Sequence, residues 1–371
     1  MTSINLIQQP EEFLRLMDLI KDSDWIGLDT EFLREKSYFP LLCLIQISAN
    51  ESSICIDPLA IEDLSALGAI LNQASTTKVL HSCRQDFEVF YQRLGILDIN
   101  LFDTQVAAAF CGYGGQVSYA ALVEEICGVK LLKSHTRTDW SKRPLIDEQM
   151  QYAMDDVKYL GQLRDVLGEM LDKQGRLKWF EEECQRIAAE KNYIIDPEQS
   201  WKRLKGAAKL PVYAQPLAKA LAIWRERRAQ SKNRPREWIL SSRSLMEICI
   251  KQPKSLSDLY SIDGLNGKTI DRVGEQIMQV LDHEVNSHQN SAIWKRKEPL
   301  DKQQRHIVKI FMKKISDVAH ENNLAQSLLG NRNDIEALVC GNSQISILSG
   351  WRYQMIGKDL ESALSLSTDS D

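Results

Sequence analysis

The first 200 residues alternate between strand-like and helix-like patterns. The stretch Trp25–Phe32 has the two-residue period of a β-strand with two different faces. One face carries Ile26, Leu28 and Thr30, and the other carries Gly27, Asp29 and Glu31. The apolar runs 41–48, 53–57 and 78–82 predict three further strands, and the short connections between the first three permit antiparallel hairpins.

Helical spacing dominates afterwards, at 107–110, at 119–127 and in a long run from about 147 to 187. Strands followed by alternating strands and helices predict an α/β layer fold with a mixed sheet. We therefore expect residues 1–200 to form one α/β domain.

From about residue 200 onward no convincing strand pattern returns. The segments 201–210 and 217–229 predict basic helices, and 253–281 predicts a helix, a glycine-containing turn and a second helix. The end of the chain, residues 364–371, has the composition of a disordered tail.

A weak internal repeat runs through this helical part. It relates Ile239-Leu240 to Leu328-Leu329, Arg243 to Arg332, and Gly264 to Gly350, with a period of roughly 85–90 residues. That period predicts two small all-helical domains, which we place at residues 201–290 and 291–371.

The composition is ordinary for a soluble globular protein, with 43% hydrophobic and 26% charged residues in a chain of 371. No apolar run approaches the roughly 20 residues of a membrane-spanning helix, and residues 1–13 lack the pattern of a secretory signal. The eight cysteines include no C-x-x-C pair, so zinc spacing is absent. We expect buried, reduced thiols in a cytoplasmic protein without a membrane partner.

Charge is unevenly distributed along the chain. Residues 1–200 carry 19 basic and 32 acidic side chains, whereas residues 201–243 carry 12 basic and 2 acidic ones, a net charge of +10. Such a concentration of positive charge favours a polyanionic partner.

Four acidic residues from three separate segments are the candidate chemistry. Asp29 and Glu31 share a strand face, Asp86 lies in a second segment, and Asp156 follows Tyr152 by one helical turn. Neighbouring carboxylates repel one another, and a divalent cation that prefers hard oxygen ligands, Mg²⁺ or Mn²⁺, would remove that penalty. A carboxylate site with two such ions cleaves phosphodiester bonds.

Each of these elements alone is more often structural. A D-x-E pair on a strand is usually a solvated face, and Asp86 could simply cap a helix. The spacing also leaves Asp155 and Asp156 as alternatives.

Three segments strongly resemble the exonuclease motifs of the DEDD superfamily, in its tyrosine branch. They are LDTEFLREKSYFPLLCLIQIS, KVLHSCRQDFEVFYQRLG and RTDWSKRPLIDEQMQYAMDDVKYL. The sequence between the second and third is similar to ribonuclease D. One minor departure is Ser37, where the family pattern leads us to expect Thr.

This resemblance implies a ribonuclease H-like α/β fold and a set of functional residues. It assigns Asp29, Glu31, Asp86 and Asp156 as ligands of two metal ions, with Asp155 as a neighbour, and Tyr152 as the residue that positions the attacking water. Phe32 could stack on a base but is better explained as core, and His81 is better explained as a structural histidine.

Residues 213–284 resemble an HRDC domain, a helical nucleic-acid-binding module found in RecQ-type helicases and ribonuclease D. We take Arg225, Arg227, Arg228 and Lys232 as candidate RNA-binding residues, while the interleaved Trp201, Trp224 and Trp238 are more simply explained as core. The last third resembles a degenerate second copy, for which RNA contact and packing that closes the molecule into a ring both stay open.

Together these expectations describe a metal-dependent 3′–5′ exoribonuclease that releases 5′-mononucleotides and trims structured RNA. The leading candidate substrates are tRNA precursors. Two alternatives stay open at this stage. One is the same chemistry on DNA, because recognition of the 2′-hydroxyl is not carried by a motif. The other is an RNA-binding protein without catalysis.

Overall fold

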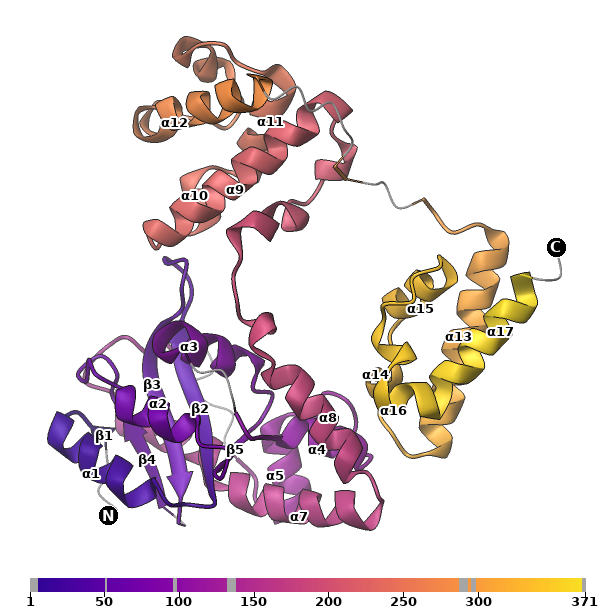
Figure 1. Ribbon diagram of the computed structural model, residues 1–371. Helices are drawn as coiled ribbons and strands as arrows, with labels where there is room; N and C mark the ends of the chain where they lie inside the picture. Colours follow the sequence, from indigo (N-terminus) through magenta and orange to yellow (C-terminus); the bar gives the residue numbers. More distant parts are fainter. Residues whose placement is uncertain are drawn as a thin grey trace. The chain divides into compact units, whose positions relative to one another are not determined.

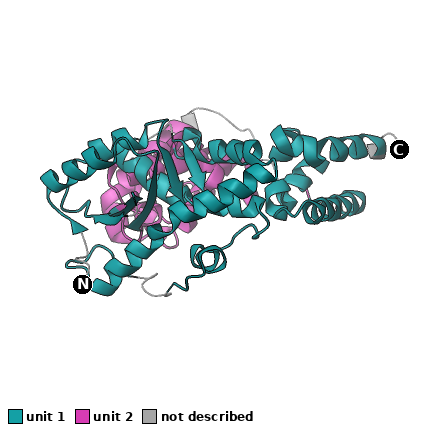
Figure 2. Cartoon of the chain, turned by 90° about the horizontal axis from the view of Figure 1, so that it is seen from below, with its two compact units in different colours: residues 1–33, 42–193, 299–371 teal, residues 34–41, 194–298 magenta. Residues whose placement is uncertain are grey.

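A computed structural model describes residues 6–50, 52–95, 99–131, 138–286, 293–294 and 298–368. The described chain divides into two compact units, which Figure 2 colours separately. The first contains residues 1–33, 42–193 and 299–371, and the second contains residues 34–41 and 194–298. No helix within the described ranges is both long enough and apolar enough to cross a membrane.

The α/β portion of the first unit contains a six-stranded mixed sheet (Figure 1). Its strands are β1 (Leu6–Ile7), β2 (Trp25–Leu33), β3 (Leu41–Ala49), β4 (Ser52–Ile56), β5 (Thr77–Leu80) and β6 (Leu101–Asp103), in the order β1-β4-β3-β2-β5-β6. β3 and β4 are antiparallel, whereas β2 with β5, β5 with β6 and β1 with β4 are parallel. The mixed sheet is confirmed; the sequence patterns missed only the two shortest strands, β1 and β6.

The alternation along β2 separates the core from the site. Ile26, Leu28 and Thr30 are buried, and Asp29 and Glu31 on the other face are half-buried. The apolar face of β2 belongs to a large hydrophobic core to which α1 (Pro10–Ile20), α2 (Ser65–Leu71) and α3 (Arg84–Leu94) contribute. A smaller cluster that includes Leu44, Cys55 and Met150 packs beside Tyr152.

The remaining helices of the α/β portion are α4 (Thr104–Phe110), α5 (Tyr119–Cys127), α6 (Asp147–Lys158), α7 (Leu160–Lys173) and α8 (Leu177–Ala188). The single long helical run expected from 147 to 187 is therefore three helices. The first break lies at Tyr159 and the second at residues 174–176. These breaks let α6 pack on β2 and β4 while α7 packs on β2 and β5.

The second unit is helical. The segment after residue 196 forms three short 3₁₀ turns, η2 (Pro197–Arg203), η3 (Ala207–Lys209) and η4 (Val212–Ala214). The prediction of a regular helix at 201–210 is therefore wrong. The turns are followed by α9 (Gln215–Ser231), α10 (Arg236–Ile239), α11 (Ser242–Lys251), the 3₁₀ turn η5 (Leu256–Ser261) and α12 (Gly267–Asn286). Its own hydrophobic core is built from α9, α11 and α12.

The C-terminal helices repeat this order. They are α13 (Lys302–Glu321), α14 (Gln326–Leu329), α15 (Arg332–Val339), the 3₁₀ turn η6 (Ser346–Leu348), and the continuous run of α16 (Gly350–Arg352), the π-turn η7 (Tyr353–Gly357) and α17 (Lys358–Thr368). The short helix α14 starts at Gln326, 90 residues after α10 starts at Arg236. The order of helices thus repeats, but the spacing of 90 residues between α10 and α14 does not coincide with the sequence pairs Ile239 with Leu328 or Gly264 with Gly350.

Two further expectations need correction. The tail expected to be disordered from residue 364 is helical as far as Thr368, and its last three residues lie outside the described ranges. All eight cysteines are free, as expected, and six are buried, but Cys127 is half-buried and Cys340 is exposed.

The C-terminal helices pack on the α/β portion, within the same compact unit. The Glu183 carboxylate on α8 pairs with Arg352 on α16, and both side chains are buried. The ring of Trp351 stacks on Trp179 at 5.3 Å between centroids. The division into three domains at residues 200 and 290 stays a prediction, because compactness groups residues 299–371 with the sheet.

Candidate active site

Strand β2 carries Asp29 and Glu31 on one face, and Gly27 on the same face allows neighbouring elements to pack closely against it. A Cβ atom on Gly27 would lie 2.1 Å from the Ser48 hydroxyl oxygen and 3.1 Å from a methyl group of Leu160. Only glycine therefore lets β3 and the start of α7 approach β2 so closely. This approach places the end of α6 beside Asp29 and Glu31.

Asp86 reaches the site from the first turn of α3, where helix amides favour negative charge. Its side chain is 7% exposed. Thr30 donates a hydrogen bond from its hydroxyl to the Asp86 carboxylate at 2.5 Å. That bond fixes the position of α3 relative to the strand that carries Asp29.

Asp156 and Tyr152 lie one turn apart on α6, and the Tyr152 phenol hydrogen-bonds the Asp156 carboxylate. Trp140 packs beside the Tyr152 ring, at 6.2 Å between centroids. Asp155, by contrast, accepts a hydrogen bond from Gln151 at 3.0 Å. The geometry therefore favours Asp156 over Asp155 as the member of the acidic set.

The four carboxylates lie within electrostatic range of one another. Burial raises the pKa of Asp29 well above its ordinary value, and Asp86, Asp156 and Glu31 raise it further. Burial, together with Asp156 and Asp86, raises the pKa of Glu31 to about 8. Burial also raises the pKa of Asp86 to about 7 and that of Asp156 to about 7. A shared, partly desolvated site of this kind favours protons or cations.

The donor set fits divalent metal ions by its chemistry. Four carboxylates offer the hard oxygen ligands that Mg²⁺ and Mn²⁺ prefer, and a cation would relieve their mutual repulsion. Across the part of the chain that the structure describes, however, no three His, Cys, Asp or Glu side chains are gathered closely enough to hold an ion as they stand. Asp86 and Asp156 nevertheless raise the pKa values of Asp29 and Glu31, so all four carboxylates lie within electrostatic range of one another.

Phe32 and His81, which lie near the acidic residues in the sequence, both have structural roles. Phe32 is half-buried and packs against the main core. The His81 ring nitrogens hydrogen-bond the Thr104 hydroxyl at 2.9 Å and the Val117 carbonyl at 3.0 Å, and burial lowers the pKa of His81. A neutral imidazole held from both sides joins β5 to the neighbouring loop, which agrees with the structural interpretation.

The candidate RNA-binding residues separate into buried and accessible ones. Arg225 is 6% exposed and donates to the Leu240 carbonyl and the Ser242 hydroxyl, each at 3.0 Å. It closes the core of the second unit, so we withdraw it as an RNA contact. Arg228 is half-buried and donates to Gln276 at 2.7 Å. Arg227 and Lys232 are exposed and stay candidates.

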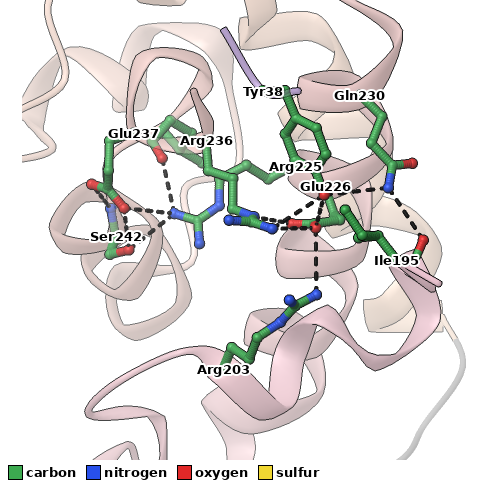
Figure 3. Close-up of polar contacts among 10 residues, drawn as sticks. Tyr38, Ile195, Arg203, Arg225, Glu226, Gln230, Arg236, Glu237 and Ser242 are labelled. Atoms are coloured by element: carbon green, nitrogen blue, oxygen red, sulfur yellow. Dashed lines mark hydrogen bonds and ion pairs between the residues drawn. The ribbon is translucent and has the colours of Figure 1, made fainter. Parts of the chain in front are cut away.

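The buried carboxylate of Glu226 on α9 accepts several polar contacts, as Figure 3 shows. Two nitrogens of Arg236 donate to it, Tyr38 donates its phenol proton, and Arg203 lies at 3.6 Å. Tyr38 belongs to the segment 34–41, which joins β2 to β3 and packs as part of the second unit. Much of the basic charge of this region is therefore committed to internal ion pairs.

The tryptophans of this unit also differ among themselves. Trp201 and Trp224 pack against the core, as expected. Trp238 is 49% exposed, so the core interpretation is wrong for it. It lines a cavity of about 350 Å³ together with the turn 264–266 that precedes α12, and with Thr269 and Arg272 on α12 itself.

Two residues that shape the site escaped sequence analysis. The strand period puts Thr30 on the face of Ile26 and Leu28, and it says nothing about a partner on α3. The Tyr119 hydroxyl donates to the Asp155 carbonyl at 3.0 Å and accepts from the Tyr159 backbone amide at 3.1 Å. It bridges the break between α6 and α7 and so fixes the turn that carries Asp156. No local pattern marks either role.

Comparison with known proteins gives the class of protein. A family model described as 3′-5′ exonuclease matches residues 4–172, and an HRDC domain model matches residues 214–281. The chain therefore contains a 3′–5′ exonuclease domain followed by an HRDC domain. The likeness of residues 302–368 to the latter depends on the shared order of helices alone.

Relatives over nearly the whole chain give the family. Ribonuclease D from Bartonella henselae is 33% identical over 368 residues, which cover 97% of this chain and 90% of that protein. Ribonuclease D from Sphingobium indicum is 36% identical over 361 residues, which cover 95% and 92%. The crystal structure of Escherichia coli RNase D, an exoribonuclease involved in structured RNA processing, matches with a TM-score of 0.87 at 31% identity, covering 97% of this chain and 98% of that one. The chain belongs to the ribonuclease D family and is a 3′–5′ exoribonuclease, a hydrolase that acts on RNA.

Proposed function

We propose that Asp29, Glu31, Asp86 and Asp156 hold two divalent metal ions, Mg²⁺ or Mn²⁺, and that the chain releases 5′-mononucleotides from RNA 3′ ends. The supporting observation is the set of four carboxylates, from β2, α3 and α6, which lie within electrostatic range of one another and have raised pKa values. When bound, such ions activate the attacking water and stabilise the charge that develops on the phosphate and the leaving oxygen.

Tyr152 orients the attacking water in this proposal. Burial and the neighbouring carboxylates raise the pKa of its phenol above the ordinary value, so it keeps its proton at neutral pH. A protonated phenol donates and accepts hydrogen bonds but does not act as a general base. The bond to Asp156 holds the phenol at the edge of the acidic set.

The substrates we propose are structured RNA precursors, with tRNA 3′ ends as the leading candidate, in the cytoplasm. The similar Escherichia coli protein is described as involved in structured RNA processing. The exposed cations of the second unit, Arg227 and Lys232, would supply affinity for the RNA backbone without sequence preference.

The test compares wild type with Asp29→Asn on matched RNA and DNA oligonucleotides that have a free 3′ end, in Mg²⁺ or Mn²⁺. We expect 5′-mononucleotides from RNA, no hydrolysis by the variant, and nearly unchanged RNA binding by both proteins. Asp155→Asn is the matched control, because that carboxylate is paired with Gln151, and it should retain activity. Undiminished turnover by Asp29→Asn would remove the metal assignment, and equal turnover of DNA would remove the RNA selectivity.

A further inference from the structure

Gln46 on β3 is a buried polar side chain without an evident purpose in the fold. Its exposure is 0%, and among the described residues neither its amide nitrogen nor its amide oxygen has a hydrogen-bond partner. Leaving both ends of an amide unpaired inside a protein is costly, so such groups are rare in native structures and a role in function is one explanation for them.

Packing places Gln46 beside β2. The strands β2 and β3 are neighbours in the sheet and are joined by only seven residues, 34–40, so they must run antiparallel. Gly27 faces Ser48, since a Cβ on Gly27 would lie only 2.1 Å from the Ser48 hydroxyl oxygen. Moving two residues along each strand in opposite directions brings Asp29 opposite Gln46, on the same face of the sheet.

The neighbour on the other side of Gln46 agrees with this placement. Cys55 on β4 is the direct register partner of Gln46, so the two side chains share a face. Burial raises the pKa of the Cys55 thiol, and the nearby Asp29 carboxylate raises it further. Cys55, Gln46 and Asp29 therefore form a row across three adjacent strands, with the amide between the thiol and the carboxylate.

We infer that Gln46 is a positioning residue for Asp29. Its amide nitrogen donates a hydrogen bond to one carboxylate oxygen of Asp29 when the carboxylate turns toward metal ions, and so selects the rotamer that binds them. This inference rests on the proposed metal-binding role of Asp29. Hydrogen bonds of this kind orient ligating side chains, and their loss typically lowers metal affinity roughly 10–100-fold.

The experiment uses Gln46→Met, which conserves volume and removes the amide. Mn²⁺ binding to the full chain is measured by calorimetry without RNA, and the unfolding temperature is measured in the absence of divalent ions. Ser48→Ala is the matched control: its hydroxyl is also buried without a partner among the described residues, but it faces Gly27 instead of a carboxylate.

We expect both variants to unfold at a higher temperature than wild type without ions, because each loses an unsatisfied polar group. Only Gln46→Met should bind Mn²⁺ about tenfold or more weakly, with a lower kcat and an unchanged KM for RNA. Equal Mn²⁺ affinity in wild type and Gln46→Met overturns the inference, as does a fall in unfolding temperature for Gln46→Met. If wild type itself binds no Mn²⁺, the proposed function fails instead, so the two failures are distinguishable.

Discussion

Thr30 on β2 donates its hydroxyl proton to the Asp86 carboxylate on α3 at 2.5 Å, and the bond is buried. Burial raises the pKa of Asp86 and this bond lowers it, which leaves the pKa at about 7. The bond therefore keeps Asp86 more readily ionised near neutral pH and available as a metal ligand.

Removing this bond should make Asp86 harder to ionise. We expect Thr30→Val to shift the acidic limb of the pH–activity profile toward higher pH and to lower activity at pH 7 about tenfold, since a hydrogen bond to a charged group contributes ~1.5–3 kcal/mol. The measurement is kcat/KM as a function of pH at saturating Mg²⁺. Thr30→Ser keeps the hydroxyl and should behave like wild type. An acidic limb that does not move in Thr30→Val would show that Asp86 does not limit activity.

The role of Thr30 illustrates what the sequence could and could not supply. The period along β2 correctly separated Ile26 and Leu28 from Asp29 and Glu31, because alternation is a local property of a strand. The partner of Thr30 lies 56 residues away on another element, and nothing local encodes it. Helix breaks were missed for a similar reason: at Tyr159 the freed backbone amide is satisfied by Tyr119, 40 residues earlier.

Charge was the least reliable guide. Arg225 and Arg227 are indistinguishable as letters in a basic run, yet one is buried beneath α10 and α11 and the other is exposed. Their positions around the helix distinguish the two arginines only when the buried face of α9 is already known. The apolar positions of α9 did not reveal it, because Glu226 is buried as well and is neutralised by Arg236.

The acidic set predicts an unusual pH dependence of stability in the absence of metal ions. The pKa of Glu31 is about 8 in the folded chain and 4.5 in a free side chain, so the folded state binds the proton more tightly. Its stabilising contribution is complete below 4.5 and is lost as the pH rises toward 8. The unfolding temperature in EDTA should therefore fall between pH 5 and about 8, and Mg²⁺ should restore it at the alkaline end.

Glu31→Gln is the control for this effect. The neutral amide cannot ionise, so the variant should show a flatter dependence of unfolding temperature on pH and a smaller gain from Mg²⁺. Identical pH profiles for the variant and wild type would mean that other groups govern the transition.

The hydrogen bond between Tyr152 and Asp156 predicts a separation of chemistry from ion binding. Tyr152→Phe keeps the ring beside Trp140 and removes only the hydroxyl. We expect kcat to fall at least tenfold, because orientation of the water is lost, while Mn²⁺ affinity measured by calorimetry changes little. A large loss of Mn²⁺ affinity would instead make the phenol a support of the ion site.

In the second unit, we expect exposed basic residues to contribute to RNA affinity and buried ones to contribute to stability. Lys232→Gln should leave the unfolding temperature unchanged and reduce the salt slope of RNA binding by about one. Arg225→Met should lower the unfolding temperature, because Leu240 and Ser242 lose their donor, without changing that slope. The measurement is RNA affinity at several salt concentrations beside thermal unfolding. A reduced slope in Arg225→Met would return that residue to the RNA-binding surface.

The buried pair of Glu183 and Arg352 predicts how the C-terminal helices are held on the α/β portion. Arg352 also donates to the Leu328 carbonyl at 2.5 Å, and Glu183 also accepts from the Trp351 indole at 3.2 Å. Arg352→Met alone leaves a buried carboxylate short of its strongest partner and should cost about 3 kcal/mol of stability. The double variant Glu183→Gln with Arg352→Met should recover much of that loss, since no buried charge is stranded. Thermal unfolding of the full chain checks both; equal stability of the single variant and wild type would mean that Arg186, which donates to Glu183 at 2.6 Å, suffices to hold the carboxylate.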